Sequence, residues 1–190
     1  MNTSRLNSGF TLVEILVSFA LFAIVMTVVT ASLTSLADGN RKNQALRSTM
    51  DAMNAAMETV SRTISVGYSY DCTASPTRNA TADCASGGST FGFVGSNGDF
   101  FIYRFGELSG LGWIERCITA GNSCVASDFV KLTPPEVDVD TVNFYVQGSA
   151  SGDDTQPHVT IIVTGKTRTG SRYETSFNLE TTVTQRLLDI

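Results

Sequence analysis

The acidic side chain with the most unusual surroundings in this sequence is Glu14, which lies at the edge of an uncharged apolar segment. The 23 residues from Ile15 to Ala37 contain no charged residue, no Pro and no Gly. A carboxylate in a membrane-spanning segment is costly, on the order of 2.5–3.5 kcal/mol at mid-bilayer and less near an end. Glu14 therefore either reaches the polar headgroups of a bilayer or pairs with a cation.

The cysteines are the next candidates for chemistry. Four cysteines permit three disulfide pairings, and proximity favours Cys72 with Cys84 and Cys117 with Cys124. A tetracysteine zinc site would usually contain two Cys residues separated by two to four others, and this spacing is absent. Disulfides that order two surface loops are the favoured interpretation, and they indicate an extracytoplasmic compartment.

Two acidic pairs offer oxygen ligands for calcium: Asp138 with Asp140, and Asp153 with Asp154. Calcium takes about 6–8 oxygen ligands, and neither pair has the loop pattern of a known site. We expect both pairs to lie in solvated turns.

The remaining polar candidates are three clustered cations, Lys166, Arg168 and Arg172, and the single histidine, His158. A basic cluster of this kind suits a DNA-contacting surface. No aromatic residue lies between the three cations, so a solvated turn is the favoured interpretation. His158 has no neighbouring Cys or acidic trio in the sequence.

The composition narrows the classes of function. The 190 residues are 42% hydrophobic and only 16% charged, against a typical charged share of about 25%. The net charge of −5 disfavours a broad nucleic-acid face. No Ser or Cys nucleophile lies in a catalytic motif, so we expect no enzyme, no catalytic residue, no cofactor and no metal.

The elements that position these residues begin with a long apolar helix. The segment from Ile15 to Ala37 would form about 34 Å of helix, enough to cross a hydrocarbon core of about 30 Å. It is longer than the apolar part of an ordinary secretory signal. A cut at Gly9, before Phe10, would leave the apolar segment attached to the chain.

The sequence GFTLVEILVSFALFAIV resembles the class III signal and N-terminal helix of type IV pilins and type II secretion pseudopilins. The resemblance implies that a prepilin peptidase cuts after Gly9 and that the new N-terminal residue, Phe10, is N-methylated. It also implies that Glu14 pairs with the N-terminal amine of a neighbouring subunit. The partners implied are other pilin or pseudopilin subunits, an inner-membrane assembly platform and, before assembly, membrane lipid.

A second helical pattern follows a polar break at Gly39 and Asn40, where the helix could fray or bend. Six apolar residues at spacings of four and three predict one buried stripe, which consists of Leu46, Met50, Met53, Met57, Val60 and Ile64. Residues 67–88 are predicted to form a surface loop.

Strand patterns occupy the rest of the chain, at 90–94, 99–105, 112–118, 129–132, 141–147, 158–166 and 172–184. Residues 172–184 alternate most clearly, and they are expected to form a hairpin with 158–166. The predicted fold is α+β and pilin-like, with a long N-terminal helix packed on an antiparallel β-sheet.

We divide the chain into a leader peptide (1–9), a transmembrane and filament-core half-helix (10–38) and an extracytoplasmic domain (39–190). The expected function is a structural subunit, minor rather than major, of a type IV pilus or a type II secretion pseudopilus. The segment FNLETTVTQR resembles J-type minor pseudopilins, and no Pro lies between Phe10 and Val66, unlike many major type IV pilins. The alternative is a pilus-tip adhesin or DNA receptor on the same anchor.

Overall fold

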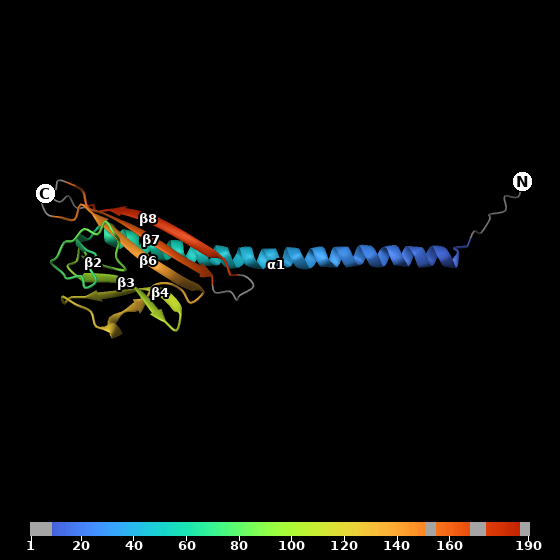
Figure 1. The fold of residues 1–190 in the computed structure, drawn as a ribbon, viewed down its shortest axis with the longest axis horizontal. Coiled ribbons are helices and arrows are strands. Elements are labelled where there is room, and N and C mark those ends of the chain that lie inside the picture. Colours follow the sequence, from blue (N-terminus) through green and yellow to red (C-terminus); the bar gives the residue numbers. More distant parts are fainter. Residues whose placement is uncertain (1–8, 151–154, 168–173, 187–190) are drawn as a thin grey trace, which may run out of the picture. The chain divides into compact units, whose positions relative to one another are not determined.

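The computed structural model describes residues 9–150, 155–167 and 174–186. A single long helix, α1 (Leu12–Ser65), precedes all of the strands (Figure 1). The chain divides into two compact units, with the boundary between Asn43 and Gln44.

Helix α1 continues through Gly39 and Asn40, so the break that the polar sequence suggested does not interrupt it. A Cβ placed at Gly39 would meet nothing within 4 Å, which means that no packing constraint acts on this turn. A single exposed Gly costs a helix only about 1 kcal/mol relative to Ala. That cost is small beside the hydrogen bonds that continue the helix on both sides.

The predicted stripe on the second part of α1 is confirmed. Met53 and Ile64 are completely buried, and Met57 and Val60 are nearly so, whereas Leu46 and Met50 are half-buried. Thr49 is also buried, which the apolar pattern did not predict. The buried stripe therefore lies on one side of the helix and leaves a polar side exposed.

The first sheet has five antiparallel strands in the order β1-β2-β3-β4-β5. Its strands are β1 (Tyr68–Asp71), β2 (Thr90–Val94), β3 (Phe100–Leu108), β4 (Leu111–Thr119) and β5 (Val130–Lys131). A short 3-10 helix, η1 (Ala126–Asp128), precedes β5.

The second sheet has three antiparallel strands in the order β6-β7-β8, which lie side by side in Figure 1. They are β6 (Val137–Gln147), β7 (His158–Thr167) and β8 (Ser176–Thr184). The α+β layout is thus confirmed, with the strands shared between two sheets.

The hairpin expected from the last two strand patterns is also confirmed. Strands β7 and β8 pair without interruption from His158 opposite Thr184 to Lys166 opposite Ser176. The alternation in β8 places Phe177 and Val183 in the core. The predicted strand began at Arg172, which lies outside the described residues, and β8 begins at Ser176.

The prediction of a loop throughout residues 67–88 is wrong at its start, because β1 occupies Tyr68–Asp71. This strand is only four residues long and lies among Ser and Gly residues, so it gives almost no periodic signal. Pairing with β2 and the complete burial of Tyr70 create the strand.

One hydrophobic core joins the buried stripe of α1 to side chains of both sheets. Aromatic rings make the connection at its centre: Phe91 of β2 stacks on Phe93 of the same strand and on Phe144 of β6, with ring centroids 5.5 and 5.4 Å apart. Tyr70 meets Phe91 edge-on at 5.5 Å. Such pairs stabilise a core by about 0.5–1.5 kcal/mol each beyond the area they bury.

Candidate processing and assembly segment

The structure describes the chain from Gly9, three residues before α1 begins at Leu12. A Cβ built on Gly9 would meet nothing within 4 Å. Phe10 is 84% exposed. A requirement for glycine at position 9 therefore has no origin in packing against the described residues and would come from whatever recognises the segment.

Thr11 and Glu14 form reciprocal hydrogen bonds at the start of α1. The backbone N–H and the hydroxyl of Thr11 both donate to Glu14 Oε2 at 3.0 Å, and the N–H of Glu14 donates to Thr11 Oγ1 at 3.3 Å. This reciprocal arrangement is a capping box, in which two side chains satisfy N–H groups that a helix start leaves unpaired. Thr11 is thus the N-cap residue of α1.

The capping box uses only one oxygen of the Glu14 carboxylate. Within the described residues, Oε1 makes no hydrogen bond or ion pair, and Glu14 as a whole is exposed. The carboxylate also lies in the first turn, where the positive end of the helix dipole favours an anion. Glu14 can therefore cap its own helix and still accept a hydrogen bond from a cation on another molecule.

The first part of α1 presents large apolar side chains on all of its sides. None of them is covered within the first unit. Together with Phe10, which precedes the helix, the exposed residues are Leu12, Val13, Ile15, Leu16, Val17, Phe19, Leu21, Phe22, Ile24, Val25, Met26, Val28, Val29, Leu33 and Leu36. A helix that is apolar all round belongs in lipid or among other helices. Among the described residues, α1 is the one helix that is long and apolar enough to cross a membrane.

Three threonine hydroxyls of this segment suit an apolar environment, because each donates a hydrogen bond to a backbone carbonyl of the same helix. Thr27 donates to the carbonyl of Ala23 at 2.8 Å, and Thr30 donates to the carbonyl of Met26 at 2.7 Å. Thr34 donates to the carbonyl of Ala31 at 2.9 Å. These bonds remove the cost of placing an unpaired hydroxyl in hydrocarbon.

Comparison with known families agrees with this geometry. Residues 4–30 match the family model described as the prokaryotic N-terminal methylation motif, which is the signal of type IV pilins and pseudopilins. No curated protein and no solved structure matches the chain. The match covers the N-terminal segment alone, so the body has to be interpreted from its own structure.

The motif supports a structural subunit of the pilin or pseudopilin type. It implies processing by a prepilin peptidase and assembly with other pilin subunits. The apolar helix near the start of the chain fits a pilin that is anchored in a membrane.

All four cysteines are in disulfides. Cys72 is bonded to Cys84, and Cys117 to Cys124, which is the pairing that proximity favoured. Both bridges close short loops. The first loop also holds Arg78, whose guanidinium donates to the carbonyls of Gly98, Ala120 and Gly121 and so connects three loops of the body.

Of the two acidic pairs, the structure describes Asp138 and Asp140, and they do not lie in the solvated turn that was expected. Asp138 lies in β6 and is 7% exposed, rather than in a solvated turn, because its Oδ1 accepts a hydrogen bond from the N–H of Gly112 at 2.9 Å. Asp140 is exposed at the irregular part of β6. Asp153 and Asp154 lie outside the described residues, and within residues 9–150, 155–167 and 174–186 no three potential ligands gather into a metal site.

The basic cluster is described only at Lys166, which forms an ion pair with Glu174 at 3.2 Å. Glu174 raises the pKa of this ammonium group above its usual value. Arg168 and Arg172 lie outside the described residues. His158 is half-buried and is the first residue of β7. In the sheet it lies between its register partners, Gln147 of β6 and Thr184 of β8.

The contacts of Thr11 and those of Glu115 were not predicted from the sequence. The role of Thr11 could have been recognised, because Thr-x-x-Glu before an apolar run is the pattern of a capping box. No sequence pattern identifies Glu115. It is buried, and it accepts hydrogen bonds from Arg104 Nε at 2.6 Å and from Trp113 Nε1 at 2.8 Å. These contacts form only when the neighbouring strands β3 and β4 pair.

Proposed function

We propose that this chain is a minor structural subunit of a type IV pilus or a type II secretion pseudopilus. Prepilin peptidase cuts it after Gly9, and the new N-terminal residue, Phe10, becomes N-methylated. The mature subunit then waits in the cytoplasmic membrane as a single-pass protein, with residues 39–190 outside, until the inner-membrane assembly platform adds it to the filament.

The observation that carries this proposal is the capping box of Thr11 and Glu14, which leaves Glu14 Oε1 unused beside an apolar helix surface. In a filament core, a free ammonium and a free carboxylate would each be costly, and pairing offsets much of that cost. The amine of Phe10 from a neighbouring subunit is the cation that we assign to Oε1. Such a pair sets the axial register between adjacent helices.

The apolar part of α1 requires two different environments in turn. Lipid covers it before assembly, and the corresponding helices of neighbouring pilin or pseudopilin subunits cover it afterwards. The internal hydrogen bonds of Thr27, Thr30 and Thr34 suit both environments, because neither supplies water to those hydroxyls.

We assign a minor rather than a major role for two reasons. No Pro interrupts the helix between Phe10 and Val66, unlike many major type IV pilins. The segment from Phe177 to Arg186 resembles J-type minor pseudopilins, and it includes all of β8 except Ser176.

The alternative of a tip adhesin or DNA receptor has no specific support among the described residues. Lys166 is engaged with Glu174, and Arg78 is engaged with loop carbonyls of its own body. A structural subunit is therefore the function we propose.

The test is incorporation into filaments. The full-length protein is expressed with its native partner subunits, filaments are sheared or pulled down, and the protein in them is quantified by mass spectrometry. The expected result is mature protein in the filament fraction at a small fraction of the major subunit. Its absence from filaments, with mature protein present in the membrane, would refute the proposal.

A further inference from the structure

Strand β8 has a free edge. It is the outer strand of the three-stranded sheet, and its nine residues pair with β7 in one continuous register. Within the described residues, no other backbone group forms a hydrogen bond with β8. Every second residue of the strand therefore directs its N–H and C=O groups away from the sheet.

The other three sheet edges are short, irregular or covered. Strand β5 has two residues, and the register of β1 against β2 is broken within its four residues. The outer side of β6 is paired, because Gly88 and Phe144 exchange two backbone hydrogen bonds of 2.9 and 2.8 Å. Proteins usually protect sheet edges in these ways. Strand β8 contains no Pro, no Gly, no Lys and no register shift, and Glu180 is its one charged residue, so it has little such protection.

A groove of about 670 Å³ lies between the last four residues of β8 and the final turns of α1. Thr181–Thr184 form one wall, and Glu58, Ser61, Arg62, Ser65 and Val66 form the other, with Arg186 at one end. Four residues of strand span about 13 Å, so a short extended segment fits alongside β8.

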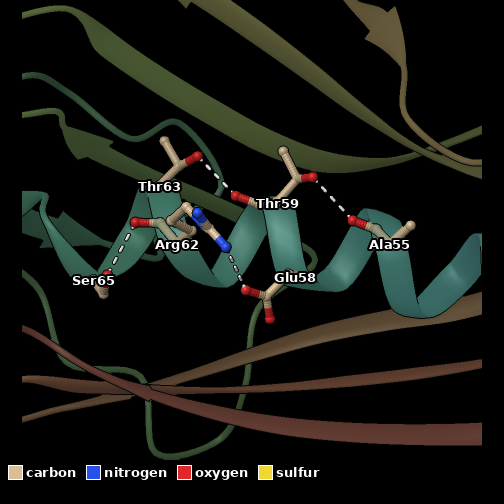
Figure 2. Close-up of polar contacts among 6 residues, drawn as sticks. All are labelled: Ala55, Glu58, Thr59, Arg62, Thr63 and Ser65. Carbon is tan, nitrogen blue, oxygen red and sulfur yellow. Dashed lines mark hydrogen bonds and ion pairs between the residues drawn. The ribbon is translucent and has the colours of Figure 1, made fainter.

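The helix wall of the groove has polar groups that are only loosely engaged. Figure 2 shows Arg62 paired with Glu58 along the flank of α1 at 3.0 Å, and both side chains are largely exposed. Exposed pairs of this kind are weak and exchange readily. The hydroxyl of Ser61 is enclosed by protein and has no hydrogen-bond partner within the described residues. The charged residues that line the groove, Arg62, Arg186 and Glu58, sum to +1, and Glu180 lies outside this lining, so the groove itself favours an anionic group.

A second copy of this chain is a poor occupant. If two β8 strands paired antiparallel and in register about a two-fold axis, the central residue Glu180 would lie opposite itself. Like charges directly opposite each other destabilise a strand pair. This arrangement disfavours a symmetric dimer and favours a partner of different sequence.

We propose that the free edge of β8 and the adjoining groove accept an extended, carboxylate-bearing segment of a different filament subunit. The segment adds a strand to β8 through main-chain hydrogen bonds, and its carboxylate lies against Arg62 and Arg186. This proposal rests on the proposed function, because the partner is a neighbour in the filament. It gives the subunit a directional contact in addition to its helix.

The test uses photo-crosslinking in the full-length protein, expressed with its native partners. p-Benzoylphenylalanine replaces Thr184 in the groove, and in a parallel sample it replaces Thr164, in the middle strand of the same sheet. We expect position 184, but not position 164, to yield an adduct that mass spectrometry assigns to an acidic, extended segment of another filament subunit.

A matched pair of variants tests the edge itself. Thr160 of β7 and Thr182 of β8 are register partners whose hydroxyls are 2.9 Å apart, so Thr160→Glu and Thr182→Glu remove the same hydrogen bond and add the same charge. Only Thr182→Glu places a negative charge on the edge strand, where it repels an acidic segment, so it should lower the adduct yield at position 184 by about tenfold. Thr160→Glu should leave the yield within about twofold, and Arg62→Gln with Arg186→Gln should reduce it several-fold.

The outcomes separate this proposal from the proposed function. Normal incorporation into filaments with no adduct at position 184 would overturn the strand addition and leave the filament role intact. An adduct with a second copy of this chain, with lipid or with nucleic acid would also overturn it. Absence of the unmodified protein from filaments would refute the proposed function, and the assignment of the partner with it.

Discussion

Thr11 and Glu14 are joined by three hydrogen bonds, which together use Oγ1 of Thr11 and only Oε2 of the Glu14 carboxylate. The remaining Glu14 oxygen is free to act outside its own chain. Capping the helix and pairing with another subunit can therefore be separated by substitution, because Thr11 takes part only in the first.

Glu14→Ala should block assembly while leaving membrane insertion and folding of the body unchanged. It would leave the amine of the neighbouring Phe10 without a partner in the filament core. Breaking a buried pair from one side costs about 3–5 kcal/mol. At about 1.4 kcal/mol per tenfold, incorporation should fall by two orders of magnitude or more. The measurement is the ratio of filament-bound to membrane-bound protein.

Thr11→Val is the matched control for the Glu14 variant. It removes the hydroxyl from the capping box and leaves the carboxylate in place, so the expected loss is about 0.5–2 kcal/mol of helix stability. Incorporation should fall by far less than for Glu14→Ala. Wild-type incorporation of Glu14→Ala would rule out the pairing role, and loss of cleavage in that variant would make Glu14 part of the processing signal.

Mature protein should begin at Phe10, with a methyl group on its amine. Gly9→Leu should abolish the cut, and since nothing lies within 4 Å of a Cβ at Gly9, the substitution should not disturb the fold. Mass spectrometry of the purified chain gives the N-terminus directly. Recovery of protein that begins at Met1, or beyond Ala31, would show that the segment is not a class III signal.

The second unit should fold without the apolar half of α1. A fragment that begins at Gly39 retains the buried stripe and should be a folded monomer. Met53→Asp should unfold it, because Met53 is completely buried and an unpaired carboxylate there costs several kcal/mol against a total stability of about 5–15 kcal/mol. Met53→Leu should cost less than about 1.5 kcal/mol. Equal melting temperatures for the two variants would contradict the position of this stripe in the core.

Periodicity explains which parts of the fold were predictable. Met53, Met57 and Val60 recur at helical spacing because one side of α1 meets the sheets, and the alternation in β8 has the same origin on a strand. Tyr70 and Asp138 have no such pattern. Their burial depends on groups that are distant in the chain, namely the Phe91 ring and the Gly112 amide.

The candidate site was predicted from one isolated charge and a family resemblance, so Glu14 was found and Thr11 was not. The capping pattern was present in the sequence and would have identified Thr11. Arg78 was beyond prediction, because its acceptors at Gly98 and Ala120 lie 20 and 42 residues away and come together only in the folded body. The free edge of β8 likewise depends on strand order, which local sequence does not determine.

Tyr70 should make the body sensitive to alkaline pH. Burial raises the pKa of its phenol above the ordinary value of 10.0, and the hydroxyl donates to the carbonyl of Ile64 at 2.7 Å. Burial raises the pKa of Tyr103 as well. Because the folded state holds these protons more tightly than the unfolded chain, their contribution is complete below pH 10 and is lost as the pH rises beyond it.

Tyr70→Phe separates the two effects of this hydroxyl. At neutral pH the variant loses one buried hydrogen bond and leaves the Ile64 carbonyl without its donor, so the free energy of unfolding should fall by about 1–3 kcal/mol. Between pH 10 and 12 the wild-type fragment should lose stability steeply, whereas the variant should lose less, since Tyr103 is then the one completely buried phenol among the described residues. Urea unfolding at a series of pH values measures both quantities. Parallel slopes for the two proteins above pH 10 would mean that the Tyr70 phenol ionises as readily in the folded body as in the unfolded chain.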